Sequence, residues 1–186
     1  VYEEFRRSPV DLLAEVLKDK GLDKARVGIE KRYLMAHYYE ELQQLLPHME
    51  IVDGSDLLEE VRAIRLPHHV EIIGRINRLT EEAVWAAWAQ ARPGNTEKEV
   101  FWLMATELGR RGADTVRHCS LTAGDNARHA HLPPGDKPLE HGDILRTDFG
   151  GIFEGYGSDI ARMGIVGEPN EEQVQWYRIH REVQRE

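Results

Sequence analysis

Two aspartates stand eleven positions apart around a glycine-rich stretch, "DFGGIFEGYGSD", which runs from Asp148 to Asp159. Strand-forming residues flank it, in "ILRT" before it and "IARMGIV" after it, so the segment is predicted to be a β-hairpin. If the loop centres on Phe153 and Glu154, residue i faces residue 307 − i. Asp148 then lies opposite Asp159 on one face of the sheet. Because directly opposed like charges are destabilising, we expect a cation between the two carboxylates.

Divalent-metal binding is the chemistry that two such carboxylates support. Asp is unfavourable in apolar or glycine-rich strands, and a pair of buried like charges requires a counter-charge or an added proton. Carboxylate oxygens bind a divalent cation at about 2.0–2.2 Å, and two cations about 3.5–4 Å apart form the dinuclear sites that drive hydrolysis. A structural or solvated pair of aspartates is the alternative interpretation.

Histidines upstream of the hairpin are further candidates. In "GDNARHAHLPP", His129 and His131 would point to one face of an extended segment. Such a pair can bind a metal, whereas a single histidine can donate a proton beside the metals or be solvated. Cys119 is expected to be a buried small hydrophobe. A catalytic dyad of Cys119 with His118 is not expected, since adjacent strand residues point to opposite faces.

The elements that must position these residues fall into two predicted parts, divided between residues 53 and 54. Residues 1–53 alternate helix and strand: a helix capped by Ser8, the strand "ARVGIE", the helix "KRYLMAHYYEELQQLL" and the strand "MEIVD". This order predicts an α/β unit with βαβ connectivity.

Residues 54–186 predict helices packed on an antiparallel sheet, an α+β arrangement. A short helix follows Gly54, and an amphipathic helix runs from about residue 69 to 91. The next helix opens with a capping box of Thr96 and Glu99. Strands and turns are predicted over residues 117–166, and a last helix opens after Asn170. The helical tryptophans are expected to serve in packing; they are Trp85, Trp88 and Trp102.

Composition excludes several classes of function. The net charge of −9 without a basic patch argues against nucleic-acid binding. No apolar run approaches about 18 residues, so no membrane span is expected. The single cysteine suits a reducing, cytoplasmic location. Because the chain starts at Val1 and ends within a predicted helix, we expect it to be a fragment.

The motifs together resemble one enzyme superfamily, that of creatinase, prolidase and methionine aminopeptidase. The matching residues are Gly124, Asn126, His131, Gly142, Asp143, Asp148, Gly150, Gly155, Tyr156, Ser158, Asp159 and Arg162. Upstream, "RPGNTEKEV" is similar to the "PG-x-TE" helix start of the prolidase and aminopeptidase P branch. The resemblance covers about residues 25–168. It implies the first half of a "pita-bread" catalytic domain, preceded by the end of an α/β creatinase-like N-terminal domain.

The resemblance also implies roles for single residues. Asp148 and Asp159 would be ligands of two divalent metals, with manganese expected and cobalt, zinc or iron as alternatives. His131 would hold the substrate and shuttle a proton. The family's other ligands, one His and two Glu, lie on later strands that have no match here. Two carboxylates are too few donors for two metals, so the chain alone is expected to bind metal poorly and to be inactive.

The implied activity of the intact protein is hydrolysis of Xaa-Pro bonds in short proline-containing peptides, by a bridging water or hydroxide. A homodimer is expected. Two alternatives stay open: a non-peptidase relative, such as a creatine-type amidinohydrolase or a lyase, and a catalytically dead peptidase-like binding module. Metal ligands alone do not select the substrate.

Overall fold

The structure is a computed structural model, and it describes residues 6–185 of the 186-residue chain. The chain separates into two compact units, the first ending at Arg65 and the second beginning at Leu66. Each unit has its own buried core. No helix among residues 6–185 is long and apolar enough to cross a membrane.

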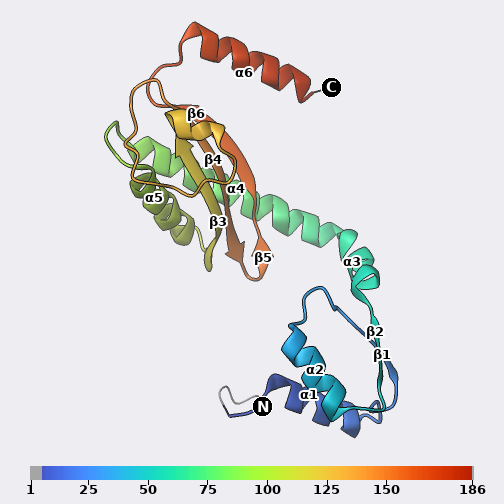
Figure 1. Ribbon diagram of the computed structural model, residues 1–186. Coiled ribbons are helices and arrows are strands. Elements are labelled where there is room, and N and C mark those ends of the chain that lie inside the picture. The colour runs from blue at the N-terminus through green and yellow to red at the C-terminus, as the bar shows by residue number, and fades with distance from the viewer. Residues whose placement is uncertain (1–5, 186) are drawn as a thin grey trace. The chain divides into compact units, whose positions relative to one another are not determined.

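The first unit has the expected alternation of helix and strand (Figure 1). Its elements are α1 (Pro9–Asp19), β1 (Arg26–Ile29), α2 (Ala36–Leu45), β2 (Glu50–Asp53) and α3 (Ser55–Ala63). Strands β1 and β2 pair in parallel, which confirms the βαβ connection. The Ser8 side chain caps α1 by accepting a hydrogen bond from the N–H of Val10.

Helix α3 belongs to this first compact unit, whereas the boundary predicted from sequence lies before it. Arg32 contacts Asp56 at 2.5 Å and Glu59 at 2.8 Å, and Arg62 contacts Glu30 at 2.5 Å. These ion pairs join α3 to the segment that follows β1. The compact unit therefore extends past residue 53 because of side-chain contacts that the residue pattern alone does not reveal.

The second unit consists of helices and a four-stranded sheet. Its helices are α4 (Pro67–Gln90), α5 (Glu97–Arg110) and α6 (Glu171–Val183). The strands are β3 (Thr115–Ala123), β4 (Ile144–Phe153), β5 (Tyr156–Gly157) and β6 (Ile160–Ile165), and the 3-10 helix η1 (Gly124–Arg128) follows β3. Strand β4 pairs antiparallel with β3 and with β6, and its end pairs with β5. The capping box of Thr96 and Glu99 is present at the start of α5.

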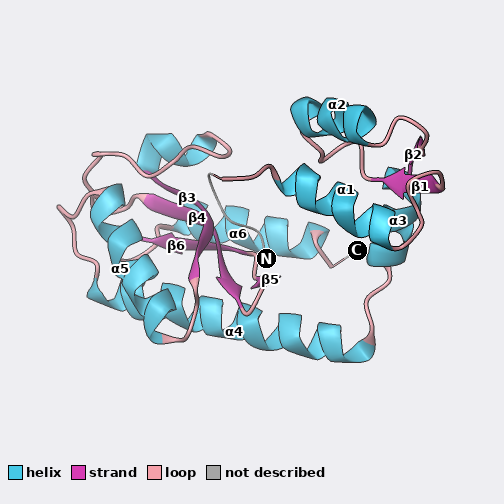
Figure 2. Cartoon of the chain, turned by 90° about the horizontal axis from the view of Figure 1, so that it is seen from below, coloured by secondary structure: helices cyan, strands magenta, loops and turns pink. Residues whose placement is uncertain are grey.

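The two faces of this sheet differ in character. Helices α4 and α5 cover one face (Figure 2), where alternate strand residues such as Leu121 and Phe149 are fully buried. The opposite face, here named the open face, carries the residues between them, including the row Ser120, Asp148 and Ala161. The α4/α5 side is therefore the core, and the open face presents polar groups.

The hairpin register differs from the predicted one. Asp148 pairs with Ala161, and Phe153 pairs with Tyr156, so the turn residues are Glu154 and Gly155 and facing positions sum to 309. Both turn residues have positive φ, 50° and 83°, as a type I′ turn requires. Glycine tolerates this conformation, while Phe153 is buried in the core. The prediction of direct opposition is wrong, because Asp159 lies diagonal to Asp148.

The three helical tryptophans differ in how far they are buried. Trp85 is 47% exposed and Trp102 is 65% exposed. Only Trp88 packs against the core, where its ring lies beside Gly164. Helical location alone did not reveal which side of each helix faces the sheet.

Candidate metal centre

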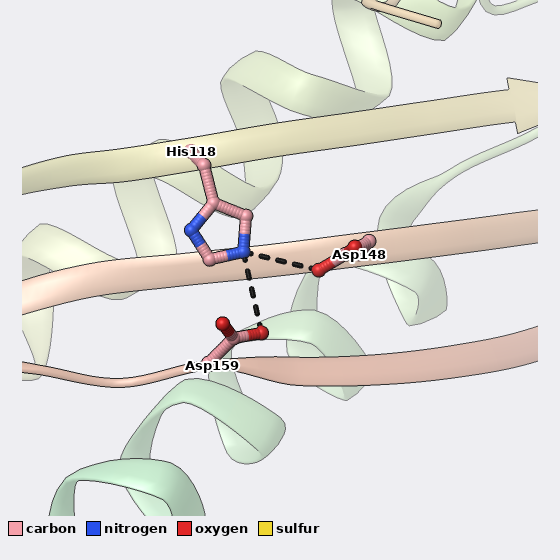
Figure 3. A group of neighbouring side chains, drawn as sticks. All are labelled: His118, Asp148 and Asp159. Carbon is pink, nitrogen blue, oxygen red and sulfur yellow. Dashed lines mark hydrogen bonds and ion pairs between the residues drawn. The ribbon is translucent and has the colours of Figure 1, made fainter. Parts of the chain in front are cut away.

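Three side chains converge on the open face: His118, Asp148 and Asp159 (Figure 3). The Nε2 atom of His118 lies 3.0 Å from Oδ1 of Asp148 and 3.4 Å from Oδ1 of Asp159. One nitrogen or oxygen atom from each residue lies within 4.8 Å of the other two. Two carboxylates and an imidazole from three chain segments therefore meet at one point.

The strand register explains this meeting. Asp148 and Asp159 occupy diagonal positions on one face, where Cα atoms are about 7–8 Å apart and longer side chains can still interact. His118 pairs with Gly150, two residues after Asp148. A Cβ on Gly150 would lie 2.6 Å from Cε1 of His118. The glycine thus leaves the space in which the imidazole reaches between the two carboxylates.

A β-bulge contributes to the same geometry. The β3–β4 register shifts between Val116 and His118, which inserts Arg117 as the extra residue. Nη1 of Arg117 lies 3.6 Å from Oδ2 of Asp159, while His118 contacts Oδ1 of the same carboxylate. Two consecutive residues therefore reach one carboxylate, contrary to strict alternation along a strand.

Helix α4 holds the segment that carries Asp159. The backbone N–H of Asp159 donates to Oδ1 of Asn77 at 3.0 Å. Thr80 follows Asn77 by three residues in α4, and its hydroxyl oxygen lies 2.7 Å from that of Ser158 in the buried interior. Residues 77 and 80 share one helix face, so they fix consecutive positions before β6.

The positive charge of Arg162 is paired with a glutamate of α4. Its guanidinium contacts the Glu81 carboxylate at 2.7 Å and 2.8 Å. It pairs with a glutamate on the helix-covered side of the sheet, rather than with an aspartate of the site.

The two aspartates are only partly compensated in charge. The Asp148 side chain is 26% exposed, and among residues 6–185 the His118 imidazole is the one basic group within 4 Å of its carboxylate. Asp159 is 63% exposed, and it contacts Arg117 as well as His118. A half-exposed pair at 3.6 Å contributes at most about 1 kcal/mol. A cation at this point would therefore meet uncompensated negative charge.

His131 is exposed and lies outside the converging group, in the loop that follows η1. Its φ of 59° is unusual for a residue with a side chain. The next carbonyl, that of Leu132, accepts a hydrogen bond from Ser120 Oγ at 3.0 Å. Because Ser120 pairs with Asp148 in the sheet, the loop passes over the open face near the aspartates. The role expected for His131 stays a prediction.

The neighbouring histidine and the cysteine have other surroundings. His129 is exposed, and its carbonyl accepts a hydrogen bond from Arg146 at 3.3 Å. Burial and the nearby Asp148 charge raise the pKa of the Cys119 thiol to about 12. The thiol is therefore protonated at neutral pH and is no nucleophile. Cys119 is partly buried and packs against the core, whereas a buried residue was expected.

Sequence reasoning missed His118 as a member of the site. That residue was considered only as a partner for Cys119, and the relevant signal was its alignment opposite Gly150 on the neighbouring strand. With it, the described residues offer one imidazole nitrogen and two carboxylate oxygens, a donor set that suits one divalent ion completed by water. Two ions would need further donors.

The sequence model of metallopeptidase family M24 matches residues 71–186. The model of the creatinase/prolidase N-terminal domain matches residues 1–64. An Xaa-Pro dipeptidase of Pyrococcus furiosus is 29% identical over 178 residues, which cover 94% of this chain and 49% of that protein. An Xaa-Pro dipeptidase of Pyrococcus horikoshii is 30% identical over 160 residues, or 86% of this chain and 45% of that protein.

Solved structures agree with these matches. The prolidase from Pyrococcus horikoshii has a TM-score of 0.81 at 27% identity, covering 98% of this chain and 51% of that one. The fold and the family resemblance expected from the sequence are thereby confirmed. The chain spans about half the length of the curated relatives it matches.

Proposed function

Because this chain belongs to metallopeptidase family M24, we propose that the protein built on it hydrolyses the peptide bond before proline, as a metal-dependent Xaa-Pro dipeptidase or aminopeptidase. The observation that carries the proposal is the meeting of Asp148 and Asp159 on one sheet face, with incomplete charge compensation. Relatives of similar sequence are Xaa-Pro dipeptidases, which supports the substrate class. In this proposal, residues 54–186 contain the first half of the catalytic domain.

The residues of this chain have separate tasks in the proposed reaction. Asp148 and Asp159 would hold divalent metal, which when bound would supply activation of a water molecule and polarisation of the scissile carbonyl. Asn77 and Ser158 keep the Asp159 segment in place through α4. His131 binds the substrate and transfers a proton, and the Ser120–Leu132 hydrogen bond keeps its loop over the open face.

The proposed dinuclear site is completed by a His and two Glu outside the matched motifs. We propose that the 186-residue chain by itself is inactive, because its described cluster has three donor residues and two metals need about four ligands each. Manganese is the proposed metal, since most donors are oxygens. The proposed protein is a cytoplasmic homodimer.

The test compares hydrolysis of Ala-Pro-type dipeptides with that of creatine, using the 186-residue chain and a protein that joins it to a family-type second half. We expect the joined protein to cleave the dipeptide with added Mn²⁺ and to lose this activity with a chelator. Asp148→Asn and Asp159→Asn should each remove at least about 99% of kcat/KM, comparable to other disrupted metal sites. His131→Ala should lower kcat/KM by about 100- to 10,000-fold, with metal content unchanged.

His129→Ala is the matched control, because His129 is also exposed in the same loop and should leave activity unchanged. Turnover of creatine in place of the dipeptide would assign the protein to the non-peptidase relatives. Binding of a peptide without turnover, in the presence of Mn²⁺, would indicate a peptidase-like binding module instead.

A further inference from the structure

We propose that His118 is a third protein ligand, so that the 186-residue chain holds one divalent transition-metal ion on His118, Asp148 and Asp159. The proposal rests on the metal site of the proposed function, but it adds a nitrogen donor and a one-ion stoichiometry. It requires no residue from outside the chain. It also replaces the expectation that this chain binds metal poorly.

The separations between the donor atoms fit shared coordination of one ion. Donor atoms at about 2.1 Å from one ion are about 3.0 Å apart along an octahedral edge and about 3.4 Å apart along a tetrahedral edge. Nε2 of His118 lies 3.0 Å and 3.4 Å from the two carboxylate oxygens. A small adjustment of side chains around a common centre would therefore convert the two contacts into coordination.

The backbone positions the His118 imidazole for metal binding. His118 lies on β3, Asp148 lies on the central strand β4, and Asp159 directly precedes β6. The absence of a side chain at Gly150 gives the ring its space, and the hydrogen bond from Asp159 to Asn77 fixes the far carboxylate. The donors are therefore held by the sheet and by α4, which reduces the conformational entropy lost on binding.

The donor types determine which ions are favoured. Imidazole suits Fe²⁺, Co²⁺ and Zn²⁺ better than Mg²⁺ or Ca²⁺, which prefer all-oxygen sites. The competing interpretation is that His118 is only a hydrogen-bonding cation between two carboxylates. That arrangement gives the same 3.0 Å contact, so coordination itself must be measured.

The experiment titrates the 186-residue chain with Co²⁺, and separately with Mg²⁺, by isothermal calorimetry. We expect one Co²⁺ per chain and at least tenfold weaker binding of Mg²⁺. His118→Asn should weaken Co²⁺ binding by about 10-fold or more, the scale of effects around metal ligands. His129→Asn, the same change at an exposed histidine outside the cluster, should leave the affinity unchanged. Circular dichroism checks the folding of each variant.

A spectroscopic measurement on the unmutated chain is independent of any folding defect in a variant. With Mn²⁺ bound, pulsed electron paramagnetic resonance should show a coupled imidazole nitrogen, and that coupling should persist in His129→Asn. Absence of nitrogen coupling, or wild-type Co²⁺ affinity in a folded His118→Asn chain, would overturn the proposal.

The failure of this inference is distinguishable from failure of the proposed function. If binding depends on Asp148 and Asp159 but not on His118, the inference fails and the proposed metal site stands. If the chain binds Co²⁺ through all three residues while the joined protein cleaves no dipeptide, the inference stands and the peptidase proposal fails. Lack of any Co²⁺ binding by the folded chain overturns the inference.

Discussion

At the scale of single residues, two basic side chains share the carboxylate of Asp159. Asp159 presents Oδ1 to His118 and Oδ2 to Arg117, so the guanidinium occupies part of the carboxylate that a metal would use. The bulge that places Arg117 there also places His118 within reach. One local irregularity therefore supplies both a candidate ligand and a competing cation.

Replacing Arg117 by Ala should tighten metal binding by this chain. The Arg117–Asp159 contact is exposed, and such pairs are worth up to about 1 kcal/mol, so affinity should rise by up to about fivefold. Calorimetric titration with Co²⁺ measures the change. Arg65→Ala, which removes the same charge in the other compact unit, is the control. Weaker binding in Arg117→Ala would contradict the assigned competition.

At the scale of helices and strands, a buried polar side chain at the start of α5 holds a loop beside the candidate site. Glu97 begins α5 and is fully buried. Its carboxylate accepts N–H groups from Ala123 at 2.8 Å, Gly135 at 2.9 Å and the Asn126 side chain at 3.1 Å. These donors flank the loop that carries His131. One side chain at a helix start therefore holds both ends of a loop that sequence analysis linked to the substrate.

Glu97→Gln should destabilise the second unit by about 1–3 kcal/mol, because an amide cannot accept all three bonds and leaves buried N–H groups unpaired. Urea unfolding followed by circular dichroism gives the free energy of unfolding. Hydrogen exchange at Ala123 and Gly135 should also accelerate. Glu99→Gln, in the exposed capping box of the same helix, should cost less than about 1 kcal/mol. Equal losses in both variants would refute the assigned role of Glu97.

For the molecule as a whole, exposed apolar surface predicts association between chains. Helix α6 presents a stripe of Trp176, Ile179 and Val183, which are 64%, 42% and 67% exposed. Together with the open-face residue Met163, α6 also lines an apolar groove. Such patches in a chain that spans half of its relatives favour self-association.

We therefore expect the 186-residue chain to form dimers or larger species at micromolar concentration, measured by analytical ultracentrifugation. Trp176→Glu should shift the population towards monomer, because the charge disfavours burial of the stripe. Trp102→Glu is the matched control, since Trp102 is 65% exposed but lies on α5. A monomeric wild-type chain, or an equal shift in both variants, would contradict this expectation.

The sequence alone predicted the structural features that depend on residues close together in the chain. The Ser8 cap, the Thr96–Glu99 capping box and the hairpin depend on residues a few positions apart. The shared face of Asp148 and Asp159 was also predicted correctly, although the register was wrong. Facing positions sum to 309 instead of 307, and a shift of two leaves every side chain on its face because strand side chains alternate with a period of two.

The placement of His118 was decided only by tertiary structure. It depends on the pairing of β3 with β4 across about 30 residues, on the bulge at Arg117 and on the space above Gly150. The contacts of Asp159 with α4 likewise join residues 82 positions apart. Local sequence determines which face a side chain takes, since this follows from backbone geometry. Which distant residues share that face depends on how the strands and helices pack.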